Sequence, residues 1–220
     1  MADPSVFGPL YWSLLEAAAA HAAALPPGHS MRACVVDFVR CWPAMLPCRE
    51  CRDDFGTVLA ASEHDAVRAG TACPLRWAHG LHAAVNRKLG APSPTLDVVR
   101  KRKRVLRYAV ENSLDLLAVT AAFLPEHGDL GALVHTVATC TRHLTESQAL
   151  APLTSTQHAW TPQSVLEQVD ACLRLLHGPR AVTTATAERV RSAAGSAWIP
   201  APAAPLQAVT RRATDMATLE

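Results

Sequence analysis

Apolar residues recur along the chain mostly three, four and seven positions apart, the spacing of amphipathic helices rather than strands. Alanine and leucine are frequent, whereas β-branched residues are spread thinly. The pattern therefore predicts an all-α protein. Its first half should hold four helices and, over residues 63–72, a short helix or a loop. The four predicted helices cover residues 7–25, 31–45, 48–62 and 75–89.

Proline and glycine mark the expected ends of these helices. Pro9 and Pro74 suit the first turn of a helix, where the missing N–H costs nothing. The run 26–28 (Pro-Pro-Gly) ends the first helix, and Gly90 suits the position just past the last one. Ser30 is the predicted N-cap of the second helix.

The second half of the chain shows the same helical spacing of apolar residues. Amphipathic segments cover residues 104–124, 129–150 and 162–177, with a further short helix expected over 184–194. From residue 197 onward proline, alanine and threonine dominate, which predicts a poorly ordered tail. The expected organisation is one compact bundle, a helical C-terminal region and a tail, covering residues 1–95, 96–196 and 197–220.

Composition narrows the class of protein. Half of the 220 residues are hydrophobic, enough for a packed core, and the formal net charge is only +2, so no nucleic-acid partner is expected. No basic, apolar leader is visible at the start, and no apolar run reaches the roughly 20 residues that span a bilayer. We therefore expect a soluble, intracellular protein.

The basic run 100–104 fits a solvated linker or helix start, with a nuclear-import-like or polyanion-contact patch as the alternative.

The most informative stretch is a Cys-x-x-Cys pair, Cys48 and Cys51, placed directly after a proline and before a helix-forming run. Two cysteines on a first helical turn can close a small disulfide ring, and the helix dipole with Arg49 and Arg52 favours a thiolate there. A protein without a secretory signal does not normally hold structural disulfides. The pair is therefore interpreted as catalytic or metal-bound.

The other cysteines carry less information. The total of seven is odd, so at least one is free or pairs between chains. Cys34 and Cys41 lie about 10 Å apart on one predicted helix, too far to bond each other. Both are interpreted as small buried residues. The sequence does not decide whether Cys34, Cys41, Cys73, Cys140 and Cys172 form disulfides or shuttle electrons.

A second polar feature lies on the fourth predicted helix. His82 and Asn86 are one turn apart on an otherwise apolar face, shortly after Trp77. Buried polar side chains need partners, and a large planar polar ligand would supply them. A histidine that is simply hydrogen-bonded within the core is the plainer alternative.

The joint order of these features resembles the Erv/ALR family of FAD-linked sulfhydryl oxidases over about residues 7–92. The matching pieces are Trp12-x-x-Leu15, Pro47-Cys48-x-x-Cys51-x-x-x-Phe55 and Trp77-x-x-x-x-His82-x-x-Val85-Asn86-x-x-Leu89-Gly90-x-Pro92.

This resemblance implies a four-helix bundle with a short fifth helix and bound FAD. It implies oxidation of thiols in protein substrates to disulfides, with O2 reduced to H2O2, by a homodimer. Cys48 would exchange with substrate thiols, and Cys51 would lie against the flavin. The implied cofactor-binding residues are Gly8, Tyr11, Trp12, Trp77, His82, Val85, Asn86 and Lys88.

The chain departs from the family pattern at several positions. Glu16 stands where the family has histidine, Ala83 where it has asparagine, and Leu46 where an aromatic residue is common. The structural disulfide of the cellular members is missing at both ends, one of which is His79. Together with the long second half, these losses resemble the sulfhydryl oxidases of large DNA viruses, baculovirus-type in particular. The second half would then be a degenerate bundle that packs where a second subunit packs in shorter members.

Two other functions fit parts of the sequence. Cys48, Cys51, His64 and Cys73 could supply four ligands to a structural zinc ion, although the spacing from His64 to Cys73 is long. A non-enzymatic helical scaffold with incidental cysteines is the third candidate.

Overall fold

The computed structural model describes residues 4–101, 109–123, 130–145, 148–154 and 160–177, and within these ranges it contains helices and no strand. The all-α, Erv-like fold predicted from the sequence is thereby confirmed. The first region holds α1 (Pro4–Ala23), α2 (Ser30–Arg40), α3 (Trp42–Met45), α4 (Arg49–Ala60), α5 (His64–Ala69), α6 (Pro74–Leu89) and α7 (Leu96–Lys101). The second holds α8 (Ala109–Phe123), α9 (Leu130–Thr145), a 3-10 turn (Gln148–Leu150), α10 (Ala151–Thr154) and α11 (Pro162–His177). The basic run beyond Lys101, the expected helix at 184–194 and the tail lie outside the described residues.

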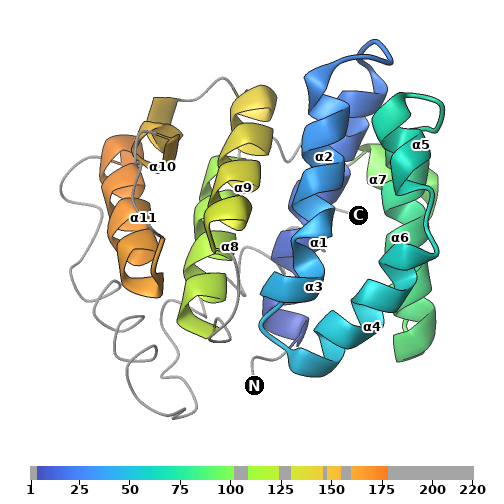
Figure 1. Cartoon of the computed structure of the whole chain (residues 1–220), viewed down its shortest axis with the longest axis horizontal. Coiled ribbons are helices and arrows are strands. Elements are labelled where there is room, and N and C mark those ends of the chain that lie inside the picture. Colours follow the sequence, from blue (N-terminus) through green and yellow to red (C-terminus); the bar gives the residue numbers. More distant parts are fainter. Residues whose placement is uncertain (1–3, 102–108, 124–129, 146–147, 155–159, 178–220) are drawn as a thin grey trace.

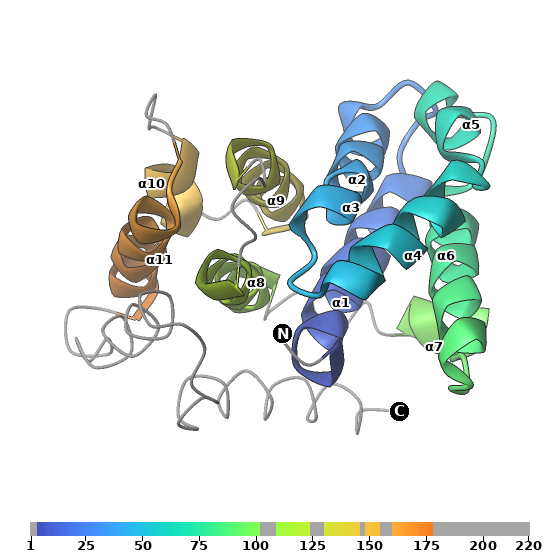
Figure 2. The ribbon, with the colours of Figure 1, turned by 60° about the horizontal axis from the view of Figure 1, so that its bottom comes forward.

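The helices form successive layers with α1 near the middle. α10 and α11 lie on one side, then α8 and α9, then α1 and α2, and finally α4, α5 and α6 (Figures 1 and 2). α1 contacts α2, α6, α8 and α9. A helix packed on several sides must be apolar nearly all round, and small side chains let its neighbours approach closely. The alanine run of α1 meets this need, since Ala18, Ala19 and Ala22 are fully buried.

The predicted second helix is divided in two. α2 ends at Arg40 and α3 starts at Trp42, so the expectation of one helix over 31–45 is wrong. Pro43 explains the division, because it has no N–H to donate to the carbonyl of Val39 one turn earlier. The predicted N-cap is also wrong by one position: His29 caps α2 by accepting a hydrogen bond from the Met31 N–H at its Nδ1, 3.1 Å away.

Two glycines end helices in the left-handed region. Gly90 follows α6 at φ 66°, as predicted, and Gly70 follows α5 at φ 84°. At Gly70 an added Cβ would also meet Pro27 at 2.8 Å, so this position needs glycine for space as well as for backbone conformation.

The two regions share one hydrophobic core. The largest buried cluster contains Leu15 and Phe38 from the first region together with Leu117 and Leu133 from the second. α8 packs against α1, and α9 packs against both α1 and α2. One buried hydrogen bond crosses this contact, between the Tyr11 hydroxyl and Thr120 Oγ1 at 2.6 Å.

α2 and α9 lie antiparallel against each other. The His29 ring, which caps the start of α2, is 5.8 Å from the His143 ring near the end of α9. Further along α2, Cys34 reaches Cys140 of α9, and the structure joins these two cysteines in a disulfide with their Cα atoms 6.1 Å apart. Cys34 is buried, as expected, and the disulfide answers a question that the sequence had left open.

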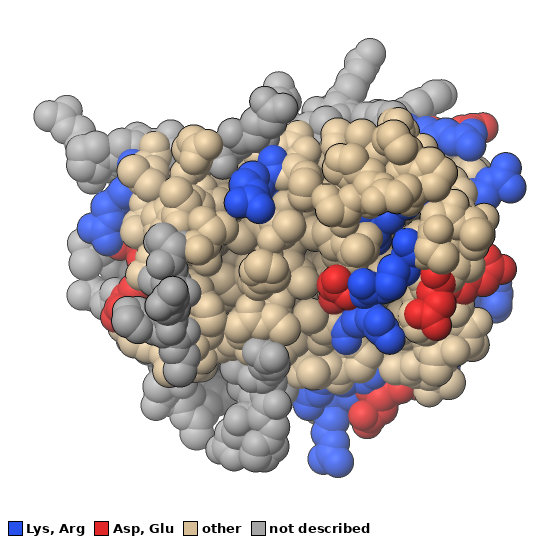
Figure 3. Space-filling model, turned by 45° about the horizontal axis from the view of Figure 1, so that its top comes forward, with Lys and Arg blue, Asp and Glu red and all other residues tan. Residues whose placement is uncertain are grey.

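Charged side chains form mixed groups on the surface. On the face drawn in Figure 3, lysines, arginines and acidic residues lie side by side at the end that holds α5 and α6. Arg68 of α5 pairs with Asp37 of α2, and Lys88 of α6 pairs with Asp54 of α4. None of the described helices is both long and apolar enough to cross a membrane.

The hydrogen bond between Tyr11 and Thr120 should contribute measurably to stability, because both hydroxyls are buried. We expect Tyr11→Phe and Thr120→Val each to lower the free energy of unfolding by about 1–2 kcal/mol, with a double-variant loss smaller than the sum. Urea denaturation of the four proteins measures this. Thr154→Val is the control, since its exposed hydroxyl bonds only within its own short helix. Additive losses would show that the two hydroxyls do not interact.

The contact between α2 and α9 should respond to acid. Burial, helped by the nearby His29, Arg142 and His21, holds the pKa of His143 below its usual value. The unfolded chain then binds a proton at this position more readily than the folded chain, so stability should fall as the pH decreases through about 6.5. We expect the melting temperature to fall less steeply between pH 7.5 and 5.5 in His143→Gln than in the unaltered protein. Equal slopes in the two proteins would contradict the assignment.

Candidate active site

The Cys48–Cys51 pair lies at the start of α4. Cys48 is the N-cap, with extended backbone dihedrals (φ −115°, ψ 124°), and its Sγ accepts a hydrogen bond from the Cys51 N–H at 3.2 Å. The structure joins the two residues in a disulfide, with Cα atoms 5.1 Å apart. Because the N-terminus of a helix favours negative charge, it would stabilise a thiolate at Cys48 when the bond opens.

The loop before the pair is held from within α4. Arg52 donates from Nη1 to the Leu46 carbonyl at 2.8 Å, which fixes the approach to Pro47 and Cys48. The two sulfur-bearing residues differ in exposure: Cys48 is only 5% exposed, whereas Cys51 is partly open to solvent. Arg49 is exposed. Of the two arginines noted in the sequence, Arg52 therefore contacts the loop of the pair directly.

An aromatic cluster continues from the cysteine pair into the bundle. Cys51 and Phe55 are four residues apart and share one face of α4. The Phe55 ring is 6.1 Å from Trp12 of α1 and 4.9 Å from Trp42 of α3. The Trp12 ring in turn lies flat on the ring of His82 of α6, with centroids 4.2 Å apart and planes 6° from parallel. The cysteine pair thus adjoins a continuous aromatic layer that ends in an imidazole.

His82 is held by a buried carboxylate. Its Nδ1 donates to Glu16 Oε1 at 2.7 Å, and the exposed fractions of the two side chains are 13% and 3%. An ionised carboxylate only accepts hydrogen bonds, so Nδ1 carries the proton and Nε2 is left for another partner. The Glu16 that departs from the family pattern is therefore a structural partner of the predicted site histidine.

Four further predicted site residues, described next, differ in their contacts and exposure. Asn86 donates from its side chain to the Pro92 carbonyl at 3.1 Å, so part of its hydrogen-bonding capacity is used within the protein. Val85 packs against the core, and Lys88 is exposed beside Asp54. Gly8 lies one turn before Trp12 on α1, and a Cβ there would meet nothing within 4 Å.

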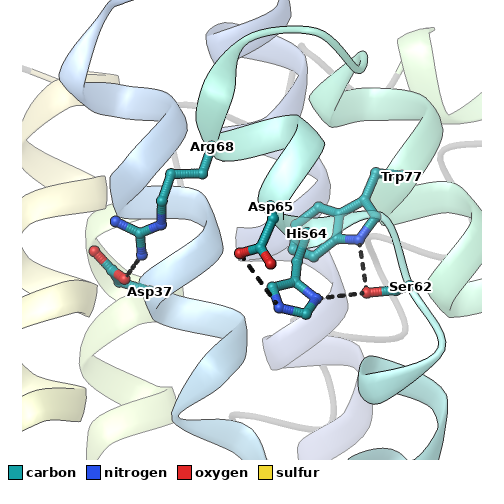
Figure 4. A network of polar contacts seen from close by, with 6 residues as sticks. All are labelled: Asp37, Ser62, His64, Asp65, Arg68 and Trp77. Atoms are coloured by element: carbon teal, nitrogen blue, oxygen red, sulfur yellow. Dashed lines mark hydrogen bonds and ion pairs between the residues drawn. The ribbon is translucent and has the colours of Figure 1, made fainter.

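Two predicted site residues point elsewhere. The Tyr11 side chain is 1% exposed, stacks on Phe38 and bonds Thr120, so its hydroxyl lies in the core between the two regions, while its ring is 5.1 Å from the ring of Trp42. Burial, and to a smaller extent the nearby Cys41, raise its pKa far above the usual tyrosine value, although the hydrogen bond with Thr120 acts in the opposite direction. Trp77 is buried and donates from Nε1 to Ser62 Oγ at 3.1 Å (Figure 4).

The groups that line this end of the bundle fit a flat ligand with a charged portion. The Trp12–His82 stack offers aromatic surface, His82 Nε2 and the Asn86 amide offer hydrogen bonds, and Lys88 offers positive charge. The indole Nε1 of Trp42, next to Trp12, is buried and has no hydrogen-bond partner among the described residues. These are the chemical groups that hold a flavin dinucleotide.

The four ligands of the alternative zinc site are spread over three helices, α4, α5 and α6. Cys48 and Cys51 are bonded to each other, and His64 contacts Ser62 and Asp65 (Figure 4). Cys73 is exposed at the N-cap of α6. Within the described ranges, no group of three or more histidine, cysteine, aspartate or glutamate side chains is placed to hold a metal ion.

The fold and the site define a class of protein: a helical thiol-redox protein whose Cys-x-x-Cys disulfide caps a helix beside an aromatic layer. Residues 10–104, a little under half of the chain, match the model of the Erv1 / Alr family, and we refer to this part of the chain as the Erv1/Alr domain. The match runs through α7, past the expected boundary at residue 95.

A viral relative agrees with this assignment. Over 106 residues the chain is 28% identical to "Putative FAD-linked sulfhydryl oxidase 096R" of Invertebrate iridescent virus 3. The aligned region covers 47% of this chain and 69% of that protein. No solved structure matches the chain. The recognition of an Erv/ALR-type sulfhydryl oxidase of viral type is thus confirmed, while the narrower likeness to baculovirus members stays a prediction.

Sequence reasoning missed three contributors to this site. Glu16 was noted only as a departure from the family, because the residue it contacts is 66 positions away. Trp42 lies six residues before Cys48, and its place beside Trp12 and Phe55 depends on how α3 packs in the tertiary structure. The role of Arg52 in holding the Leu46 carbonyl depends on loop geometry that no spacing reveals.

Removing the Glu16 carboxylate should release the His82 ring. We expect Glu16→Ala to lower the free energy of unfolding by about 1–3 kcal/mol, because the buried imidazole loses its acceptor. Proton–nitrogen NMR of the histidine rings should show the Nδ1–H form of His82 in the unaltered protein and its loss in the variant. Glu63→Gln is the control, since Glu63 makes no side-chain cap to α5. An unchanged His82 spectrum in Glu16→Ala would refute the pairing.

Proposed function

We propose that the protein is a FAD-dependent thiol oxidase that introduces disulfides into protein substrates through Cys48 and Cys51 and passes the electrons to O2, forming H2O2. The observation that carries this proposal is the Cys48–Cys51 disulfide at the N-terminus of α4, one turn from Phe55 and the aromatic layer that reaches His82. Membership of the Erv1/Alr family and the name of the viral relative support thiol oxidation as the activity.

Disulfide formation in a substrate then proceeds by two exchanges. A substrate thiolate attacks Cys48 Sγ, the Cys48–Cys51 bond breaks, and Cys51 takes the electron pair as a thiolate. A second substrate thiolate attacks the substrate sulfur of this mixed disulfide, and Cys48 leaves as a thiolate. The Cys51 N–H and the helix dipole stabilise the charge on Cys48, which makes it a good leaving group.

The two electrons now on the cysteine pair must reach an acceptor. Bound FAD supplies this two-electron chemistry and the connection to O2. In this proposal Trp12 and His82 provide stacking surface for the flavin dinucleotide, Asn86 and the unpartnered Trp42 Nε1 provide hydrogen bonds, and Lys88 faces the phosphates. Glu16 holds the His82 ring in place.

The order of the two sulfurs follows the family resemblance, with Cys48 facing substrate and Cys51 facing flavin. Position on α4 supports this order, because Cys51 shares the face of Phe55. Exposure by itself favours the reverse order, since Cys48 is 5% exposed and Cys51 is more open. A substrate thiol must therefore approach Cys48 from the loop side, past Leu46 and Pro47.

The wider setting is also proposed from the resemblance. Substrates are thiol-containing proteins, the active form is a homodimer, and the setting is the cytoplasm or nucleus of an infected host cell or the virion. We further propose that α8 and α9 occupy the place of a second subunit in shorter family members. Their packing against α1 and α2 supports this, and it leaves other faces of the chain for dimer formation.

The purified protein should be yellow, and its flavin absorbance should bleach when dithiothreitol is added without oxygen. With oxygen present, we expect Cys48→Ser and Cys51→Ser each to lower dithiothreitol-dependent oxygen consumption by about 100-fold or more, because the two sulfurs act as a unit. Cys73→Ser, at an exposed cysteine outside the pair, is the control and should keep the rate.

The single variants also test the order of the sulfurs. Cys51→Ser should trap a mixed disulfide between Cys48 and a substrate thiol, and Cys48→Ser should change the visible absorbance of the flavin through the Cys51 thiolate. The opposite pairing of results would reverse the order. A colourless protein with stoichiometric zinc, or full activity in either variant, would refute the proposed function.

A further inference from the structure

We propose that Cys34–Cys140 is a permanent structural disulfide that fastens the second helical region to the Erv1/Alr domain and takes no part in redox turnover. Cys34 lies on α2 inside the family match, and Cys140 lies on α9 outside it, 106 residues along the chain. This inference does not rest on the proposed oxidase function.

The helix faces around the bond are complementary. Thr136 and Cys140 are four residues apart on α9, so both face α2. The Thr136 carbonyl lies 3.7 Å from Cys34 Sγ. The contact between His29, at the start of α2, and His143, near the end of α9, agrees with the same antiparallel packing of the two helices. Packing of α2 against α9 therefore holds the two sulfurs together before any bond forms. The Cα separation of 6.1 Å lies within the range of ordinary disulfides.

Complete burial of one of its two sulfurs, that of Cys140, separates this bond from a redox-cycling one. Cys34 is 8% exposed and Cys140 is completely buried, so a substrate thiolate has no route to the Cys140 sulfur. Thiol–disulfide exchange needs an attacking thiolate in line with an accessible sulfur. The Cys48–Cys51 pair differs in position rather than in the exposure of its first sulfur, since Cys48 is 5% exposed: the pair closes a short ring at the N-terminus of α4, and its second residue, Cys51, is partly open. A buried bond across a long loop resists the reducing thiols of a cell.

Formation of the bond is a balanced two-electron exchange. One of the two thiolates attacks a disulfide oxidant and forms a mixed disulfide, releasing one thiol of the oxidant. The other then attacks the protein sulfur of that mixed disulfide, forms the Cys34–Cys140 bond and releases the second thiol. Two protons and two electrons leave the cysteines, and the oxidant becomes a dithiol or two thiols.

The chain offers a matched control for this bond. Cys172 of α11 is as deeply buried as Cys140 but forms no disulfide. Burial raises its pKa to about 12, so it stays a neutral thiol over the accessible pH range. A substitution at Cys172 therefore changes core packing by a similar amount without breaking a cross-link.

Peptide mapping tests the bond directly in the unaltered chain. Cells are lysed in N-ethylmaleimide so that free thiols cannot oxidise afterwards, and the protein is digested with trypsin without reduction. Trypsin releases Cys34 within residues 33–40 and Cys140 within residues 108–142, each as the only cysteine of its peptide. We expect one species with the summed mass of the two peptides less two hydrogens, which separates into the two peptides after denaturing reduction. Recovery of both peptides as maleimide adducts from folded protein would overturn the proposal.

Thermal unfolding tests the structural role. Reduction should lower the melting temperature of the unaltered protein and of Cys172→Ala by about 10 °C more than that of Cys34→Ala or Cys140→Ala, whose cross-link is already absent. The contribution of Cys48–Cys51 cancels in this comparison because all four proteins contain that pair. The double variant Cys34→Ala/Cys140→Ala should lose less than the sum of the single variants. Equal effects of reduction on all the proteins would refute the structural role.

Discussion

The packing of α1 on several sides at once is the constraint on which the rest of the structure depends. α2, α6, α8 and α9 all contact it, so almost every position on the helix must be small or apolar. The alanine run permits this close approach. A helix in this place can carry a polar group only where a neighbour supplies a partner, since an unpartnered buried group costs about 1–3 kcal/mol.

Two polar side chains of α1 meet that condition on different neighbours. Glu16 is paired with His82 of α6, and Tyr11 is bonded to Thr120 of α8. One contact belongs to the candidate active site, and the other joins the Erv1/Alr domain to the second helical region. The same helix therefore orients the aromatic layer beside the cysteine pair and anchors the part of the chain that lies outside the family match.

The two disulfides use the same bond in opposite environments. Cys48–Cys51 closes a short ring at the end of a helix, where N–H groups stabilise a thiolate and one residue is partly open to solvent. Cys34–Cys140 joins two packed helix faces in the interior. A cross-link of the second kind resists exchange and constrains the unfolded chain, whereas a bond of the first kind is suited to repeated opening.

The sequence by itself determined the local features of this protein. Helical periodicity predicted the elements, Gly90 marked the end of α6, and the short spacing of Cys48 and Cys51 placed both sulfurs on one turn, because each feature depends on residues within about a turn of one another. The tertiary structure alone decided that Glu16 meets His82, that Tyr11 turns toward Thr120 and that Cys34 reaches Cys140, at separations of 66, 109 and 106 residues. Such contacts depend on which helix faces pack together, and the periodicity of a single helix shows which face is buried without showing what covers it.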